Sequence, residues 1–178
     1  MRKLSMDELN RKSVDDFRQA DKMPVIVVLE NIRSAYNVGS VFRTADAFLL
    51  QDIYICGYTA RPPHKEIKKT ALGSDEAVNW AHFPNAAAAI EQLRADGYKV
   101  FAVEQAQDSI ALQQFNRQQQ DKTALVFGNE VTGVEQSTIL LCDGCIEIPQ
   151  MGTKHSLNVS VAAGVVLWEM IRQHISAL

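Results

Sequence analysis

The residues best suited to chemistry lie in three short segments that combine polar side chains with glycine. Asn31 and Arg43 belong to the first segment (residues 31–48), Glu130 to the second (126–134), and Ser156 and Asn158 to the third (148–169). Guanidinium, carboxylate, hydroxyl and amide groups can together bind and orient a polar ligand. The chain has no Gly-Lys-Ser/Thr phosphate loop and no nucleophile motif. The segments therefore predict a binding site in which side chains position a ligand.

The third segment predicts a helix of unusual composition. No ionisable side chain occurs between Ser156 and Trp168. These thirteen residues are too few to cross a bilayer, which needs roughly 18 or more. We expect the apolar body to be buried in protein, and Ser156, Asn158 and Ser160 to lie on the first turns. The free N–H groups of a helix start favour a polar ligand there.

Each segment also has a simpler explanation when it is taken alone. Ser156 and Asn158 could merely cap the last helix. The Gly128–Glu130 stretch could be a tight turn, and Arg43 could lie on a solvated helix face. Only the combination of the three segments is specific.

The apolar pattern predicts how the segments are held. Strand-length runs cover residues 25–30, 52–57, 78–83, 98–104, 123–128 and 145–149, and helical patterns cover 38–50, 64–72, 84–97, 134–141 and the C-terminal run. This alternation predicts an α/β domain with a mainly parallel sheet and helices on both faces. The polar segments follow three of these strands, and ligands bind beyond the carboxyl ends of parallel strands.

The N-terminal region predicts a small appendage. Ser5 and Glu8 form a capping-box signature in a polar stretch, which predicts a helix over residues 5–20. We therefore divide the chain into a short N-terminal helical extension, residues 1–20, and a single domain, residues 21–178.

Charge and composition limit the classes of function. A net charge of −3 argues against a protein that coats nucleic acid without specificity. One stretch is basic and could be either a solvated loop or a small phosphate footprint, through Arg61, Lys65, Lys68 and Lys69. The N-terminus has no apolar signal region and no run is long enough for a membrane span, so we expect a cytoplasmic protein.

The cysteines and histidines predict no special chemistry. Cys142 and Cys145 form a CxxC that follows a helical run and leads into a strand, the reverse of a redox motif. We expect these two thiols and Cys56 to be plain buried groups. His64 and His82 have no metal-ligand spacing, so no metal is expected.

Taken together, the segments carry a family resemblance. The stretches NIRSAYNVGSVFRTADAF, VFGNEVTGV and IPQMGTKHSLNVSVAAGVVLWE resemble, in order and spacing, the three motifs of the SpoU/TrmH family of RNA ribose 2′-O-methyltransferases. The stretch IKKTALGS also looks like this family, and the resemblance covers about residues 24–173. One departure is Ser34-Ala35-Tyr36, where many members read differently, which leaves local contacts in doubt.

The resemblance implies a fold, a cofactor and an assembly. The fold would be the SPOUT α/β fold with a C-terminal trefoil knot. The knot would form a pocket for S-adenosylmethionine from the loops after Val103, Gly128 and Ile148 and from Leu157. The protein would be a homodimer with the last helix at or near the interface.

The resemblance also implies roles for individual residues. Arg43 would stabilise the forming alkoxide and an adjacent phosphate, because a guanidinium with a pKa above about 12 is a poor base. Glu130 would orient RNA or receive a proton through water, and Asn31 would hold Arg43 or the ribose. Ser156 and Asn158 would bind substrate or lock the knot. Contacts to RNA are expected from Arg33, Arg61, Lys65, Lys68 and Lys69. His155 is expected to be an ordinary loop residue.

The expected reaction is methylation of a ribose 2′-hydroxyl in tRNA or rRNA, with tRNA favoured for so compact a chain. Three alternatives remain open. The first is a dimer that binds RNA without catalysis, and the second is a methyltransferase acting on a base nitrogen or a protein. The third is another nucleotide-binding α/β enzyme.

Overall fold

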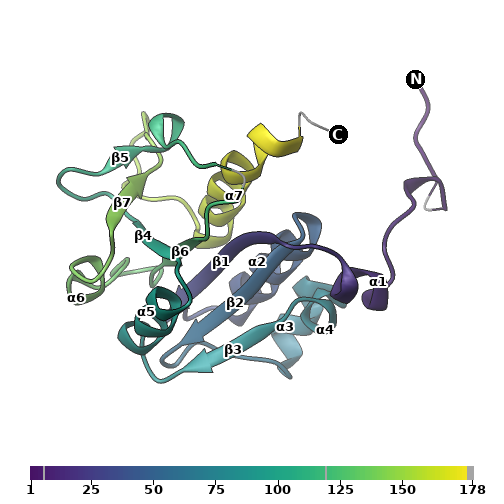
Figure 1. Cartoon of the computed structure of the whole chain (residues 1–178), viewed down its shortest axis with the longest axis horizontal. Helices are drawn as coiled ribbons and strands as arrows, with labels where there is room; N and C mark the ends of the chain where they lie inside the picture. Colours follow the sequence, from purple (N-terminus) through teal and green to yellow (C-terminus); the bar gives the residue numbers. More distant parts are fainter. Residues whose placement is uncertain (6, 119, 176–178) are drawn as a thin grey trace.

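A single sheet of parallel strands organises the chain. The computed structural model describes residues 1–5, 7–118 and 120–175. Within this part of the chain the strand order is β3-β2-β1-β6-β4-β7-β5 (Figure 1). The strands are β1 Met23–Glu30, β2 Leu50–Cys56, β3 Trp80–Phe83, β4 Lys99–Val103, β5 Ile110–Ala111, β6 Thr123–Phe127 and β7 Gly144–Glu147. All pairings are parallel, as predicted.

Helices cover both faces of this sheet. The alternation along β1 shows the two sides, because Val25, Val27 and Leu29 enter one apolar cluster while Ile26 and Val28 enter another. The first cluster is covered by α2 Ala35–Ala47, α3 Lys65–Ala71, α4 Ser74–Ala77 and α7 Val159–Ile175. The second is covered by α5 Ala86–Ala95 and α6 Gln136–Ile139. The predicted fold class is confirmed.

Several predicted boundaries are wrong for local reasons. Six strands were predicted, but the two-residue β5 adds a seventh at the sheet edge, followed by the short 3-10 helix η2 Leu112–Gln114. Helix α2 begins earlier than residue 38, because the Ser34 hydroxyl caps it by accepting a bond from the Asn37 N–H. The helix predicted over 134–141 shrinks to the four residues of α6.

The N-terminal region is not one helix. It contains a 3-10 turn η1 Asp7–Leu9 and a separate helix α1 Val14–Gln19. The Ser5 and Glu8 capping contacts do form, but Asn10 adopts a left-handed φ of 45° and ends the turn. The first residues project from the body of the molecule (Figure 1). Met6 of the predicted extension and residues 176–178 of the predicted domain lie outside the described residues.

Helix α7 differs most from expectation. It begins at Val159, so Ser156 and Asn158 precede it, and both are exposed rather than buried. The Asn158 side chain caps the helix by accepting a bond from the Ser160 N–H at 2.9 Å. One face of the helix is buried, but the opposite face is exposed in the single chain through Val161, Val165 and Trp168. Among the described helices, none is long and apolar enough to pass through a membrane.

The three cysteines are free thiols, as expected from the sequence. Cys56 and Cys145 are buried and Cys142 is partly buried, all as free thiols. Burial raises the pKa of the Cys56 and Cys142 thiols to about 12. These thiols are therefore protonated at neutral pH and unreactive.

Helices α2 and α3 approach closely at Gly39. A Cβ there would overlap the Thr70 hydroxyl and the Ile67 carbonyl oxygen. We predict that Gly39→Ala lowers the free energy of unfolding by about 1–3 kcal/mol, the range for overpacking. Urea unfolding measures this, with Gly152→Ala as the control because no heavy atom lies within 4 Å of its Cβ position. Equal stability of the two variants would contradict the close approach.

Candidate functional site

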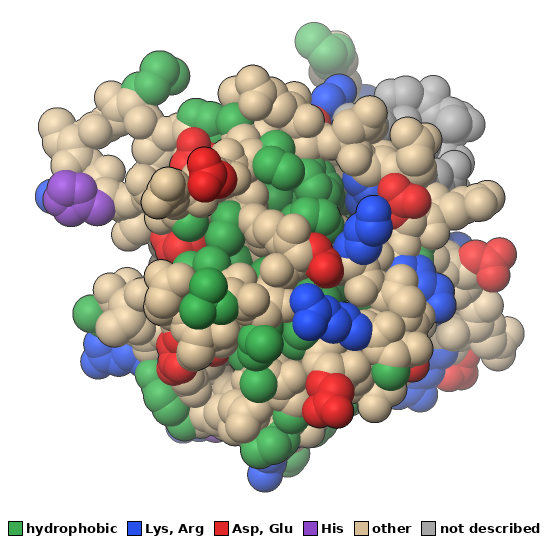
Figure 2. Space-filling model, turned by 60° about the vertical axis from the view of Figure 1, so that its left-hand side comes forward, with side chains coloured by type: hydrophobic (Ala, Val, Ile, Leu, Met, Phe, Trp, Pro, Cys, Tyr) green, Lys and Arg blue, Asp and Glu red, His purple; other side chains and the backbone are tan. Residues whose placement is uncertain are grey.

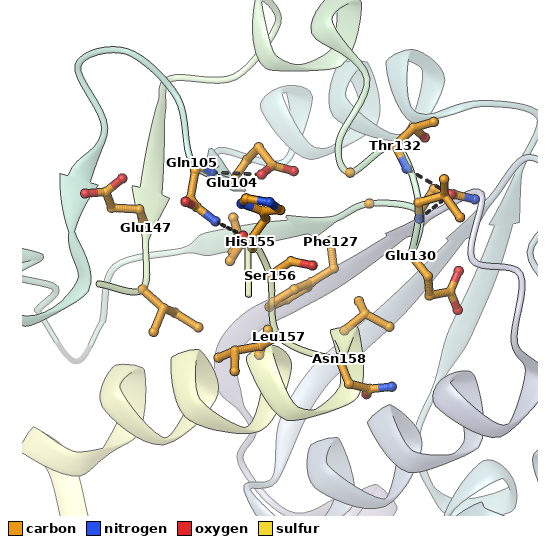
Figure 3. Close-up of a pocket in the computed structure, with 18 of the residues that line it drawn as sticks. Glu104, Gln105, Phe127, Glu130, Thr132, Glu147, His155, Ser156, Leu157 and Asn158 are labelled. Atoms are coloured by element: carbon orange, nitrogen blue, oxygen red, sulfur yellow. Dashed lines mark hydrogen bonds between the residues drawn. The ribbon is translucent and has the colours of Figure 1, made fainter. Parts of the chain in front are cut away.

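A pocket opens at the carboxyl ends of β4, β6 and β7. It has a volume of about 510 Å³ and is lined by the loops after these strands and by the start of α7 (Figure 3). A volume of this size suits a small-molecule ligand. The predicted cofactor-binding residues Val103, Gly128, Ile148 and Leu157 all line it. The structure thus brings together residues that lie far apart in the chain.

The predicted catalytic residues divide into two groups. Glu130, Ser156 and Asn158 line the pocket. Arg43 is exposed on α2 and lines a separate shallow groove with Phe48 and Lys69. Asn31 lies behind the pocket wall, at the end of β1. A single chain therefore does not bring Arg43 into the pocket.

The Glu130 carboxylate joins the second segment to the first. Its oxygens accept hydrogen bonds from the Arg33 N–H at 2.8 Å, the Ser34 N–H at 3.0 Å and the Asn37 side-chain amide at 2.8 Å. Burial by itself would raise the pKa of Glu130, but these donors outweigh it, so the pKa lies below its usual value. Glu130 is therefore ionised at neutral pH and is a weaker base than an ordinary glutamate.

Asn37 connects all three segments and was missed as a site residue. The side-chain nitrogen of Asn37 donates to Glu130, and its side-chain oxygen accepts a hydrogen bond from the Asn158 side-chain amide at 3.2 Å. In the sequence, Asn37 was noted only as part of the first segment. Its role follows from contacts 93 and 121 residues away along the chain, which no local pattern encodes.

Asn129 is a second residue that the sequence did not single out. Its side chain is only 9% exposed and makes four hydrogen bonds. The carbonyl oxygen accepts from the Val131 and Thr132 N–H groups at 2.8 and 3.2 Å. The amide nitrogen donates to the Asn31 carbonyl oxygen at 2.8 Å and the Tyr58 hydroxyl at 2.7 Å. Four bonds satisfy the whole capacity of an asparagine amide.

Asn31 and Glu30, at the end of β1, bind the segment that follows the Glu130 loop. Asn31 has a left-handed φ of 54°; its side chain donates to Glu135 at 2.9 Å and accepts from the Tyr58 N–H at 3.4 Å. Glu30 is buried, and its carboxylate accepts from the Glu135 N–H at 3.0 Å and the Thr138 hydroxyl at 2.5 Å. Burial raises the pKa of Glu30 despite these bonds. Both residues hold the start of α6 in place.

Further contacts tie the pocket walls together. Glu104 accepts bonds from the Val134 N–H at 3.0 Å and the Gln105 N–H at 2.9 Å. The Gln105 side chain donates to the His155 carbonyl oxygen at 2.5 Å, which joins the β4 loop to the third segment (Figure 3). A Cβ at Gly128 would overlap the backbone of Gly133, so glycine is required for the turn. The walls are therefore fixed before any ligand binds.

The expected RNA-binding residues lie outside the pocket. Arg33 and Arg61 are exposed in loops, and Lys65, Lys68 and Lys69 are exposed on α3. Lys69 also lies 5.8 Å from the ring centre of Tyr36 and shares the groove with Arg43. Arg43 on α2 and Lys69 on α3 thus bring two cations to one groove. Among the described residues, no group of three His, Cys, Asp or Glu side chains could hold a metal ion.

Comparison with known proteins agrees with this geometry. Residues 24–168 match the model of the SpoU rRNA methylase family. A tRNA (guanosine(18)-2′-O)-methyltransferase of Thermus thermophilus is 31% identical over 96% of this chain and 86% of its own. A 23S rRNA (guanosine-2′-O-)-methyltransferase of Vibrio parahaemolyticus is 30% identical over 96% of this chain and 68% of its own.

A solved structure extends the comparison to three dimensions. The AdoMet-bound rRNA methyltransferase from Sinorhizobium meliloti superposes with a TM-score of 0.79 and 30% identity. The match covers 92% of this chain and 61% of that protein.

The saturated amide of Asn129 leads to a prediction. Asn129→Asp keeps the shape but removes both donors, and it places a carboxylate against the Asn31 carbonyl oxygen. We expect it to lower the free energy of unfolding by about 1–3 kcal/mol, the cost of unsatisfied buried polar groups. Urea unfolding checks this. In the matched Asn85→Asp control, the side chain only accepts from the Ala88 N–H, which an aspartate does equally well. Two variants of equal stability would contradict the role of Asn129.

Proposed function

This chain belongs to the SpoU rRNA methylase family, and from that premise we propose how its residues serve the reaction. It is an S-adenosylmethionine-dependent methyltransferase that acts on a ribose 2′-hydroxyl in tRNA or rRNA. The observation that carries this function is the single pocket built from the second and third segments and joined to the first through Glu130 and Asn37.

The pocket suits a cofactor with a positive charge and an apolar ring. Among the residues that the structure describes, its charged lining side chains are Glu104, Glu130 and Glu147, and no lysine or arginine lines it. Val103, Gly128, Ile148 and Leu157 would hold S-adenosylmethionine against backbone and apolar side chains. The bound cofactor supplies a methyl group that its sulfonium already activates for displacement. The protein's task is then alignment, which can contribute roughly 7–11 kcal/mol.

Arg43 is proposed to activate the acceptor. A ribose hydroxyl is a poor nucleophile until its developing negative charge is stabilised, and fixed cationic donors do this strongly. We assign this role to Arg43, together with a contact to the adjacent phosphate. An Arg43→Lys enzyme with normal turnover would contradict a bidentate contact.

The other four predicted catalytic residues are proposed to position the substrate. Glu130 is ionised by its hydrogen bonds, so we favour its orienting role over that of a proton acceptor. Ser156 and Asn158, exposed at the mouth of the pocket, would contact the RNA. Asn31 would act by holding the loops after β2 and β6 rather than by touching ribose.

A homodimer would complete the site. The start of α7 lines the pocket, while Trp168 packs on Phe48, with ring centres 6.1 Å apart, and Phe48 shares its groove with Arg43. Val159 and Trp168 are roughly 14 Å apart along α7, at 1.5 Å per residue. If two copies pack their exposed α7 faces in opposite directions, the Arg43 groove of one copy meets the pocket of the other.

Surface composition supports this assembly. Figure 2 shows exposed hydrophobic side chains among polar ones on one face of the molecule. On α7, the exposed large hydrophobic residues are Val161, Val165 and Trp168. Exposed apolar groups of this kind mark interaction surfaces. We also propose the trefoil knot at residues 150–158, since this stretch lines the pocket between β7 and α7.

For the substrate we favour tRNA over rRNA, because the relative named for tRNA aligns over more of its own length. Arg33, Arg61, Lys65, Lys68 and Lys69 would contact its phosphates. We place the enzyme in the cytoplasm, with these RNA pools.

Methyl transfer tests the function directly. Labelled S-adenosylmethionine is supplied with separated tRNA and rRNA pools from a strain that lacks this protein. We expect label in one pool, most simply tRNA, at a site that resists alkaline cleavage. Arg43→Ala should reduce transfer about 10²- to 10³-fold, as loss of one stabilising donor does. The control Arg94→Ala removes an exposed arginine on α5 and should transfer normally. Cofactor binding without label in either pool would favour a non-catalytic RNA-binding protein.

Light scattering tests the dimer. Wild type should have a mass near twice 19.8 kDa, and Val165→Glu should be monomeric because it places a charge in the proposed interface. Val14→Glu is the matched control, since Val14 is 40% and Val165 41% exposed. A monomeric wild type would contradict the assembly.

A further inference from the structure

Tyr58 combines high exposure with a rigid setting. It follows β2, and 64% of the residue is exposed. Exposed aromatic side chains are usually free to change rotamer, and ordering one on binding has a cost. The surroundings of Tyr58 remove much of that freedom.

The backbone is fixed on both sides of Tyr58. Gly57 has a left-handed φ of 65°, and the space for a Cβ is occupied by the Asn31 side chain. Thr59 is 4% exposed; its hydroxyl accepts from the Ile32 N–H at 2.8 Å and donates to the Leu29 carbonyl oxygen at 3.1 Å. The N–H of Tyr58 itself bonds to Asn31. The loop is therefore held to the end of β1.

The tip of the side chain is fixed as well. The Tyr58 hydroxyl accepts a bond from the Asn129 amide at 2.7 Å. Asn129 is buried and lines the cofactor pocket. Both ends of the tyrosine are thus attached to the site, while much of the side chain faces solvent.

We propose that Tyr58 is a base-stacking residue that positions the RNA beside the methylated ribose. This rests on the proposed function. Single-stranded RNA is bound through aromatic rings on which bases stack, next to cations that follow the backbone. Tyr58 has this arrangement, because Arg61 supplies a cation three residues further along the same loop. The ring also lies at the site, because its partner Asn129 directly precedes Glu130. The hydroxyl tether orders the ring before RNA arrives.

Two substitutions separate stacking from a structural role. Tyr58→Ala removes the ring, and Tyr58→Phe keeps the ring but loses the hydroxyl contact. The binding of the RNA pool that accepts methyl groups is measured by filter retention, and S-adenosylmethionine binding by calorimetry. Leu140→Ala is the control, since Leu140 is 77% exposed at the C-terminal end of α6 and does not line the pocket.

We expect Tyr58→Ala to weaken RNA binding by about tenfold or more, the scale for one stacked base. Cofactor affinity should stay within about twofold. Tyr58→Phe should weaken RNA binding by less than Tyr58→Ala does, because it keeps the ring and loses only the hydroxyl tether. Leu140→Ala should bind RNA as wild type does. Ultraviolet cross-linking followed by mass spectrometry should find a nucleotide on residue 58 of wild type.

Two results would overturn the proposal. One is unchanged RNA affinity in Tyr58→Ala. The other is a parallel loss of RNA and cofactor binding, equal in the alanine and phenylalanine variants, which would mean that Tyr58 only supports Asn129. Failure of the proposed function looks different, since wild type would then label neither pool.

Discussion

The site depends on satisfying buried polar groups where parallel strands end. The loops after β1, β2 and β6 meet at Asn129. Its side-chain amide makes four hydrogen bonds, and together these reach all three loops. An unused buried donor or acceptor is costly, so loop arrangements that leave one of these four groups unpaired are disfavoured. The hydrogen bonds of Asn129 therefore help to hold the pocket wall in one conformation. Glycine at 128 and 133 lets the chain turn tightly enough to reach this arrangement.

Two glutamates of the same region show how surroundings set chemistry. Glu30 is buried at the end of β1, and this burial raises the pKa of its carboxyl group. Glu130 lies at the surface of the pocket, where donors from the start of α2 dominate and lower its pKa. Glu30 therefore supports α6 from a buried position. Glu130 keeps a negative charge, which binds the start of α2 to the pocket. Neither property follows from the residue type, since both depend on partners about a hundred residues away.

Periodicity and strand-end position were enough to predict the sheet, its two layers of helices and the pocket loops that follow β6 and β7. These features depend on local pattern and on the general geometry of parallel sheets. The part of the pocket that follows β4 was expected only from the family resemblance. Asn37, Asn129 and Tyr58 could not be predicted, because their importance arises from contacts between distant segments. The N-terminal helix was predicted wrongly although its capping box exists, since a cap does not determine where a helix ends. The apolar run of α7 did not reveal which face the chain itself buries, and only the family resemblance placed this helix at or near an interface.

The order in which the strands pair has a consequence for synthesis on the ribosome. The central strands β1 and β6 join Val25 to Thr123, and the last wall of the pocket comes from Leu157 to Ala162. A nascent chain that has emerged only as far as β4 has neither the centre of its sheet nor a cofactor pocket. Such distant pairings are slow to form. The pocket can therefore form only after β6 and the start of α7 have been made, which is also when the β1–β6 pairing at the centre of the sheet becomes possible.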